Sequence, residues 1–433
     1  MWRKSWLVIV ASLMVVSTVL TACSSSGKPS ATGATSLPNT STSSSASGSS
    51  APKGAAIVLG TICSCTGPAA SATGDDQATY TAWQDMVNAS GGINGHPVKI
   101  IVKDDTGSPT LALQDAKQLV EQNKIMALVG MGSVVPSAFA GYMQQAGIPV
   151  IGGITSDNTM VTNPDFYPVG SNLTVVTAGF LKNAEKVGGN GFGVAYCAEF
   201  PACKAAYQIA ATEAPTSGGV KVSSTTLSQS TPNFLSQCLA IKSSGVGSVE
   251  VAGIPTETQR LVDDCAQQGV KVNYVQVEWT IAQQEIRDPN FSGMLLLGAD
   301  APYEDASVPG TAQFLNALNK YAAGTTANAE FTPNAYMSWL GLQLFAAASQ
   351  AAGGFTPTST PADVKKGLYD LRGTTLDGST PPLTYTPDQP TVLSCYFVSQ
   401  VKNGAVTYPE GTQAQCLSTA ELTGVNRAIA GLR

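Results

Sequence analysis

The feature that most constrains the fold is the alternation of short apolar runs with amphipathic stretches, in two successive blocks. Continuous apolar runs of this length are typical of buried parallel strands. Strict alternation with helices requires crossover connections, which are right-handed and produce parallel sheets. Two such blocks predict an α/β fold with two doubly wound lobes. Ligands in this architecture lie outside the carboxyl ends of the strands, so we expect a site in the cleft between the lobes.

The expected elements follow the chain in order. The strands are predicted at 55–59, 98–102, 127–129, 148–151, 193–196, 220–224, 247–251, 272–277 and 294–297. The helices are predicted at 77–88, 111–121, 204–213, 234–243 and 256–268, with a further helix that begins near Pro136.

The first 22 residues have the pattern of an export signal. Arg3 and Lys4 precede an uncharged apolar run over residues 6–20, which is shorter than the roughly 20 residues a membrane span needs. The run ends in Leu20-Thr21-Ala22-Cys23, which resembles a bacterial lipobox. We expect residues 1–22 to be removed and Cys23 to carry acyl chains such as palmitate, anchoring the protein at the outer face of the cell membrane. The alternative is an ordinary secretory signal with an incidental cysteine.

Residues 23–53 form the predicted link between anchor and folded part. Twelve of the thirty residues in 24–53 are serine, and most others are Thr, Ala, Gly or Pro. This composition buries too little apolar surface to offset the entropy of ordering, so the segment is expected to be a flexible tether.

Composition narrows the function classes. The remaining stretch of about 380 residues exceeds one ordinary core, which again favours two domains. Charged residues make up 12% of the chain and the net charge is −6, with no basic stripe. We therefore expect no nucleic-acid partner.

Nine cysteines indicate an oxidising compartment. With Cys23 set aside, eight remain, which allow 105 pairings. Cys197 and Cys203 flank a turn-like loop, Cys238 and Cys265 lie in successive predicted helices, and Cys395 and Cys416 bracket a strand–turn–strand segment. Cys63 and Cys65 then remain by exclusion. A metal or redox role for that last pair is the alternative. The single histidine, His96, argues against most histidine-containing metal sites.

Several motifs together resemble the type I periplasmic-binding-protein family, in its Leu/Ile/Val and amide branch. The strongest is Asn88-Ala89-Ser90-Gly91-Gly92-Ile93-Asn94-Gly95 followed by the strand that ends in Asp104-Asp105. Weaker matches in the right order are Thr66-Gly67-Pro68, the run at 147–151, Thr162-Asn163-Pro164 and Pro302-Tyr303. The resemblance implies three crossings between the lobes. It places 54–175 and 301–373 in one lobe, and 176–300 and 374–433 in the other.

The resemblance also implies candidate ligand contacts. Ser133 ends the third predicted strand and opens onto a helix, whose backbone N–H groups together with the hydroxyl suit a carboxylate, although Val134 departs from the family's serine pair. Glu278 resembles the family's acidic position for a ligand ammonium, and Trp279 beside it is expected to wall the pocket. The other expected contacts are Thr66, Thr155, Ser156, Tyr196 and Phe200. Local capping, loop hydrogen bonds or core packing are the alternative roles for these side chains.

The implied function is a monomeric receptor without cofactor or metal. It would capture a small polar solute, such as a branched-chain or other amino acid or an amide, and deliver it to the permease of an ABC importer. A sensory receptor of the same fold is the runner-up. No catalytic motif of the G-x-S-x-G, H-E-x-x-H or Walker type occurs, so an enzyme is not expected. A structural cell-envelope protein, which needs no cleft, is the third class.

Overall fold

The computed structural model describes residues 51–186, 191–217 and 219–431. The predicted signal peptide, the Cys23 anchor and nearly all of the tether lie outside these residues. In the described part of the chain, no helix has both the length and the apolar character that a membrane span requires.

The first sheet contains five described strands, all parallel, in the order β2-β1-β3-β4-β5. Their bounds are Ile57–Cys63 (β1), Val98–Asp104 (β2), Leu128–Met131 (β3), Val150–Gly153 (β4) and Phe166–Tyr167 (β5). Central strands β3 and β4 are buried along their whole length, as continuous apolar runs in a parallel sheet should be.

Helices cover both faces of this sheet. On one face, aromatic side chains of α2, α11 and α12 pack in a cluster with β1 and β3. On the other face, the cluster contains Phe139 of α4 and Leu119 of the short π-helical segment that follows α3. The bounds are Ala70–Thr73 (α1), Asp76–Ala89 (α2), Pro109–Lys117 (α3), Ser137–Gln145 (α4), Thr159–Thr162 (α5), Pro309–Tyr321 (α11), Asn334–Ala351 (α12) and Pro361–Asp370 (α13). We call these strands and helices the first lobe.

The second sheet has eight described strands in the order β12-β11-β10-β9-β8-β6-β7, with β13 paired to β11. Strands β6 to β10 are parallel, whereas β11 runs antiparallel to β10, β12 and β13. The bounds are Phe192–Cys197 (β6), Val222–Leu227 (β7), Ser248–Ala252 (β8), Asn273–Val277 (β9), Leu295–Gly298 (β10), Cys395–Lys402 (β11), Ala405–Thr407 (β12) and Gln415–Cys416 (β13).

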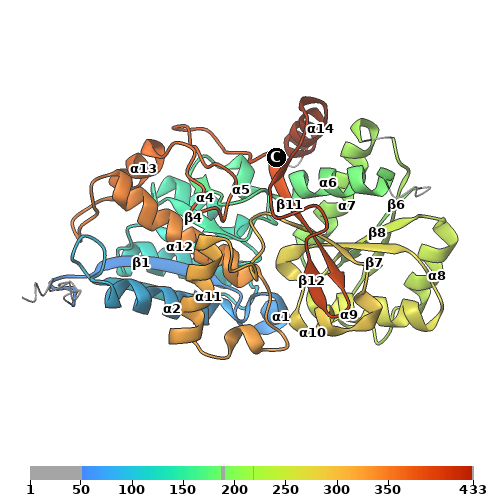
Figure 1. Cartoon of the computed structure of the whole chain (residues 1–433). Coiled ribbons are helices and arrows are strands. Elements are labelled where there is room, and N and C mark those ends of the chain that lie inside the picture. The colour runs from blue at the N-terminus through green and yellow to red at the C-terminus, as the bar shows by residue number, and fades with distance from the viewer. Residues whose placement is uncertain (1–50, 187–190, 218, 432–433) are drawn as a thin grey trace, which may run out of the picture. The chain divides into compact units, whose positions relative to one another are not determined.

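The helices of the second lobe also lie on both faces of its sheet. Helices α6, α7 and α14 share one apolar cluster, and α14 lies beside α6 and α7 in Figure 1. Helices α8 and α9 pack on the opposite face. The bounds are Leu173–Lys186 (α6), Pro201–Glu213 (α7), Leu235–Ser244 (α8), Pro255–Gln267 (α9), Gln283–Arg287 (α10) and Thr419–Gly431 (α14).

Three connections join the lobes, between β5 and α6, between β10 and α11, and between α13 and β11. They lie against one another, because Ser171 N donates to Ala299 O and Ala301 N donates to Ser379 O. A Cβ on Gly170 would lie 2.4 Å from Ala299 O, so only glycine allows this approach. The connections thus form the three-stranded hinge of a two-lobed α/β fold, which confirms the predicted fold class.

The third crossing comes later along the chain than the sequence led us to expect. Leu376, Leu383, Tyr385 and Leu393 are buried in the cluster of the first lobe. The chain joins the second sheet at Cys395, where β11 begins. By packing, these four side chains therefore lie with the first lobe, whereas Val392 packs against the cluster of the second lobe.

Four disulfides lie within the described residues, and they join the cysteines that the sequence paired. Cys63–Cys65 closes the end of β1, Cys197–Cys203 links β6 to α7, Cys238–Cys265 links α8 to α9, and Cys395–Cys416 links β11 to β13. The helix pair that carries Cys238 and Cys265 lies on one sheet face, which explains how cysteines 27 residues apart come together.

Candidate functional site

A pocket lies between the lobes at the carboxyl ends of the strands. It contains about 740 Å³ of space between atoms, part of which is open to solvent. We call it the cleft pocket. Its lining residues are, from the first lobe, Ala72, Thr73, Ser133, Val134, Pro136, Ile154, Ser156, Asp157 and Asn334, and, from the second lobe or the hinge leading to it, Leu173, Phe200, Ala202, Cys203, Ala206, Glu250, Ala252, Gly253, Ile254, Val277, Trp279 and Thr280.

The first-lobe wall contains Ser133, whose hydroxyl already has a partner within the protein. It donates to Asp105 Oδ2, and the Asp105 Oδ1 atom accepts from Ser64 Oγ at 2.6 Å and from Gly107 N at 2.8 Å. Asp105 is fully buried, and burial raises the pKa of its carboxyl. Ser133 therefore lines the pocket, but its hydroxyl donates its hydrogen bond to Asp105 and not into the cavity.

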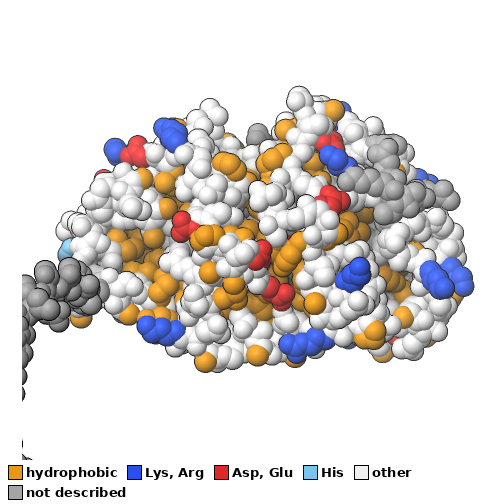
Figure 2. Space-filling model, in the orientation of Figure 1, with side chains coloured by type: hydrophobic (Ala, Val, Ile, Leu, Met, Phe, Trp, Pro, Cys, Tyr) orange, Lys and Arg blue, Asp and Glu red, His pale blue; other side chains and the backbone are white. Residues whose placement is uncertain are grey.

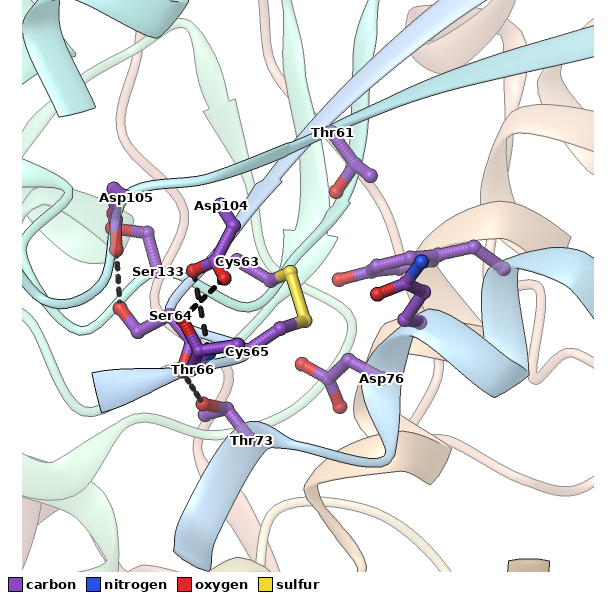
Figure 3. The surroundings of a disulfide bond; sticks show 12 residues. Thr61, Cys63, Ser64, Cys65, Thr66, Thr73, Asp76, Asp104, Asp105 and Ser133 are labelled. Carbon is purple, nitrogen blue, oxygen red and sulfur yellow. Dashed lines mark hydrogen bonds between the residues drawn. A yellow bond between two sulfur atoms is a disulfide. The ribbon is translucent and has the colours of Figure 1, made fainter. Parts of the chain in front are cut away.

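The end of β1 forms a polar corner beside this wall (Figure 3). Thr66 donates from its hydroxyl to Asp104 Oδ2 at 2.6 Å and does not line the pocket. Thr73, which does line it, donates to the backbone oxygen of Ser64 at 2.6 Å. The Cys63–Cys65 disulfide lies between these groups and Asp76 in Figure 3. These contacts hold the loop after β1 in place beside the cavity.

Ser156 and Trp279 meet across the cleft. Trp279 Nε1 donates to Ser156 Oγ at 2.9 Å, which joins the loop after β4 to the turn after β9. Both residues line the pocket, and Trp279 is 2% exposed. Phe200, which follows β6 and precedes α7, lies on the same cavity. These three sequence-derived candidates, with Ser133, are brought together by the structure.

Thr155, Tyr196 and Glu278 do not line the pocket. Thr155 is buried and donates to the backbone oxygen of Ser171 at 2.9 Å, next to the hinge. Tyr196 stacks on Tyr207 of α7, with ring centroids 6.1 Å apart. These contacts hold the side chains of Thr155 and Tyr196 away from the cavity.

Glu278 is buried close to the hinge. An added Cβ on Gly298 of β10 would lie 2.2 Å from Glu278 Oε2, so the carboxyl is packed against that strand. Burial, followed by the nearby charge of Glu304, raises its pKa to about 8. The carboxyl that the resemblance assigned to a ligand ammonium therefore does not line the pocket, whereas its neighbour Trp279 does.

Glu250 is a pocket residue that the sequence analysis missed. It lies in the middle of β8, is 1% exposed, and lines the cavity, yet neither carboxylate oxygen has a hydrogen-bond partner in the described part of the chain. Burial raises its pKa to about 8. The signal was present in the sequence, because Val249-Glu250-Val251 places an acid inside an otherwise apolar strand.

The lining as a whole is apolar with a few polar groups. Its ionisable carboxyls are Asp157 and Glu250, and among the described residues that line it there is no Lys or Arg. On the face in Figure 2, charged side chains are scattered singly or in small groups. The pocket is thus suited to an apolar solute, with hydrogen-bonding groups at a small number of points.

One group of residues near the cleft has a spacing that could hold a metal, namely Cys197, Glu199 and Glu257. Cys197 is bonded to Cys203, so its sulphur is not a thiolate. Two carboxyls remain, and burial, followed by the charge of Glu199, raises the pKa of Glu257 to about 7. Such a pair is a weak metal site while the disulfide is intact.

Comparison with known proteins agrees with this two-lobed arrangement. A family model described as "Periplasmic binding protein" matches residues 56–405, which is most of the chain. An "Amino acid binding protein" of Pseudomonas aeruginosa (strain PAO1) is 40% identical over 55 residues. That stretch covers 12% of this chain and 15% of the length of that protein.

Solved structures resemble the fold over nearly their full length. A fatty acid ABC transporter substrate-binding protein from Thermomonospora curvata aligns with a TM-score of 0.70 at 17% identity, covering 85% of this chain and 94% of that one. A protein described as a possible leucine/isoleucine/valine-binding protein from Rhodopirellula baltica aligns with a TM-score of 0.68 at 14% identity, covering 84% of this chain and 96% of that one. At these identities the likeness shows a shared fold.

Proposed function

Because the chain belongs to the periplasmic binding protein family, we propose that it is an extracytoplasmic receptor that captures a small, largely apolar solute and delivers it to an ABC importer. The observation that carries this proposal is the cleft pocket, which draws its walls from both lobes and is bridged by the Trp279–Ser156 hydrogen bond. Lobes joined by a hinge can close around a solute and present one surface to a membrane partner.

The apolar lining favours solutes with a substantial hydrocarbon part. Branched-chain amino acids satisfy that condition, as do longer apolar chains. The fold is shared with a fatty acid receptor and with a possible leucine/isoleucine/valine-binding protein. The occupied hydroxyl of Ser133 and the absence of Lys and Arg from the described lining both weaken the case for a solute held mainly by its carboxylate.

A ligand panel tests the receptor function. Purified protein would be unfolded and refolded to remove any bound solute, then screened by thermal shift against amino acids, amides, fatty acids, alkylamines, polyamines and sugars. A ligand at about 100 times its dissociation constant adds about 2.7 kcal/mol to the free energy of unfolding, a clear rise in midpoint. The matched control is Ala252→Leu, which fills the pocket and should abolish the shift. A panel with no binder, or binding unchanged in Ala252→Leu, would contradict the proposal.

Membrane attachment through Cys23 is part of the same proposal. It rests on the lipobox-like Leu20-Thr21-Ala22-Cys23 and on the serine-rich segment that follows. Mass spectrometry of the N-terminal peptide should find an acylated cysteine, and Cys23→Ser should release the protein from membranes. An unmodified N-terminal peptide that begins at another residue would contradict the lipid anchor on Cys23, but it would not contradict the receptor function.

A sensory receptor of the same fold is the alternative, and the cleft pocket supports it equally. Neighbouring genes for a permease and an ATPase would favour import, whereas a neighbouring sensor kinase gene would favour signalling.

A further inference from the structure

Glu250 lies at the inner end of the cleft pocket. Side chains alternate between the two faces of a strand, and Val249 and Val251 face the cluster of α8 and α9. Glu250 and Ala252 therefore face the opposite side, where both line the pocket. Ala252 is nearer the carboxyl end of β8, which opens on the cleft, so Glu250 is the deeper of the two.

The walls around this inner end come from the second lobe and are apolar. Ala202 and Ala206 of α7, Leu173 of α6 and Val277 of β9 all line the cavity. The pocket thus continues from the cleft into the space between the helices α6 and α7 and the sheet. A solute that fills this extension would place its innermost atoms beside the Glu250 carboxyl.

A second buried carboxyl lies behind Glu250. Glu213, the last residue of α7, is fully buried, and neither of its carboxylate oxygens has a hydrogen-bond partner among the described residues. Burial and, second, the charge of Glu250 raise its pKa well above the usual value. An isolated carboxylate in apolar surroundings is unfavourable, and without a partner Glu250 keeps its proton up to a pKa of about 8. A cation that takes the place of this proton would leave a paired carboxylate, so this end of the pocket suits an ammonium group.

We propose that the ligand of this receptor has an apolar body ending in an ammonium group, and that the ammonium is bound by the Glu250 carboxyl at the inner end of the cleft pocket. This inference rests on the proposed receptor function and names its ligand class. It differs from the sequence-derived expectation, in which Glu278 binds the ammonium. An ammonium would supply the partner that both Glu250 oxygens lack, and the apolar walls would contact the hydrocarbon body.

The test compares three six-carbon probes that differ at one end, namely hexylamine, 1-hexanol and hexanoate, by isothermal titration calorimetry at pH 7. Wild-type protein should bind hexylamine at least tenfold more tightly than either of the others. Only hexylamine carries an ammonium group that can form a buried charge pair with Glu250. Glu250→Gln keeps the size of the side chain and should weaken hexylamine at least tenfold while leaving hexanol within about threefold. The surface change Glu330→Gln is the matched control.

The outcomes separate this inference from the receptor function. Equal affinity of Glu250→Gln and wild type for hexylamine, or tighter binding of hexanoate than of hexylamine, overturns the ammonium site. A tenfold loss in Glu278→Gln but not in Glu250→Gln also overturns it, in favour of the sequence-derived position. If no six-carbon probe binds but another member of the panel does, the inference fails and the receptor function stands. If nothing binds, both fail. Retention of the far-ultraviolet spectrum and a cooperative melt would show that Glu250→Gln is folded.

Discussion

Asp105 connects three loops at the first-lobe wall. Its two carboxylate oxygens accept hydrogen bonds from Ser64 after β1, from Ser133 after β3 and from the backbone of Gly107. Both serines are fully buried. Because buried hydroxyls are costly without a partner, this one carboxyl fixes the relative positions of the two loops that border the pocket.

Replacing Asp105 by alanine should therefore destabilise the protein strongly. Ser64 and Ser133 would each lose their acceptor, and we expect a fall of roughly 2–4 kcal/mol in the free energy of unfolding. Urea unfolding followed by circular dichroism measures it. Asp105→Asn keeps one oxygen acceptor and should lose less. A change below about 0.5 kcal/mol in Asp105→Ala would show that the hydroxyls find other partners.

Glu278 should make stability depend on pH. Burial and Glu304 raise its folded pKa to about 8 from an ordinary 4.5. Other groups on the surrounding elements interact with it, namely Asp300, Tyr303, Tyr336, Ser399 and Tyr408. Between pH 5 and 8 the folded protein retains a proton that the unfolded chain releases, so stability falls as pH rises.

The expected slope from one such group is up to about 1.4 kcal/mol per pH unit. Its stabilising contribution is complete below about pH 4.5 and is lost as pH rises through about 8. Glu278→Gln should remove the part of the pH dependence of stability that Glu278 contributes. The variant should therefore be more stable than wild type at pH 8 but differ little from it at pH 5. Urea unfolding at several pH values tests this, with Glu330→Gln as control. Parallel pH profiles for wild type and Glu278→Gln would contradict it.

At the scale of the element, neighbouring residues in the sequence determine where α13 begins. Thr360 is extended, Pro361 occupies the first helical position, and Asp363 is the third. Thr360 Oγ1 accepts from Asp363 N at 3.3 Å, while Asp363 Oδ2 accepts from Thr360 N at 2.7 Å. This reciprocal capping satisfies two backbone donors that a helix start leaves free. The cap sets where α13 begins, and Val364 and Leu368 then face the core.

Loss of that cap should lower the thermal midpoint by about 1–3 °C in Thr360→Ala. Thr358→Ala is the matched control, because Thr358 is exposed in the same loop and its hydroxyl forms a hydrogen bond with Thr356 Oγ1 rather than with a backbone donor of the helix. Differential scanning calorimetry measures the thermal midpoints of both variants. Equal midpoints for both variants would show that packing on α12 alone determines this helix start.

At the scale of the whole molecule, the contact between Trp279 and Ser156 links the two lobes across the cleft. The hinge connections lie against one another, joined by the Ser171–Ala299 and Ala301–Ser379 bonds. A hydrogen bond that exists only when the lobes meet favours the closed arrangement by its net free energy, about 1 kcal/mol.

Trp279→Phe and Ser156→Ala should each weaken binding of any cleft ligand severalfold, and the double variant should show about 0.5–1.5 kcal/mol of non-additivity. Calorimetric dissociation constants for the four proteins give this value. Fully additive effects would mean that the bond contributes no more than the contacts each side chain makes separately. A gain in affinity in Ser156→Ala would contradict its role in closure.

The sequence by itself determined the fold class and most of the parallel strands, but it did not predict the short strand β5 or the helices α6, α11 and α12. Strand runs such as Val98–Asp104 and the helix containing Tyr80 and Trp83 follow from local periodicity, and periodicity requires no knowledge of distant residues. The polar and aromatic residues near the cleft, including Ser133, Ser156, Phe200 and Trp279, were also predictable, because they follow strands whose carboxyl ends face the cleft between the two sheets.

Only the tertiary structure decided which side chains face the cavity and where the chain crosses. Glu278 and Trp279 are adjacent in sequence, yet one packs against β10 and the other lines the pocket. Glu250 becomes a pocket residue because α6 and α7 leave space over its face of β8, and Leu393 joins the first lobe because its partners come from distant helices. Side-chain direction along a strand is local, but what covers that face depends on residues remote in the chain.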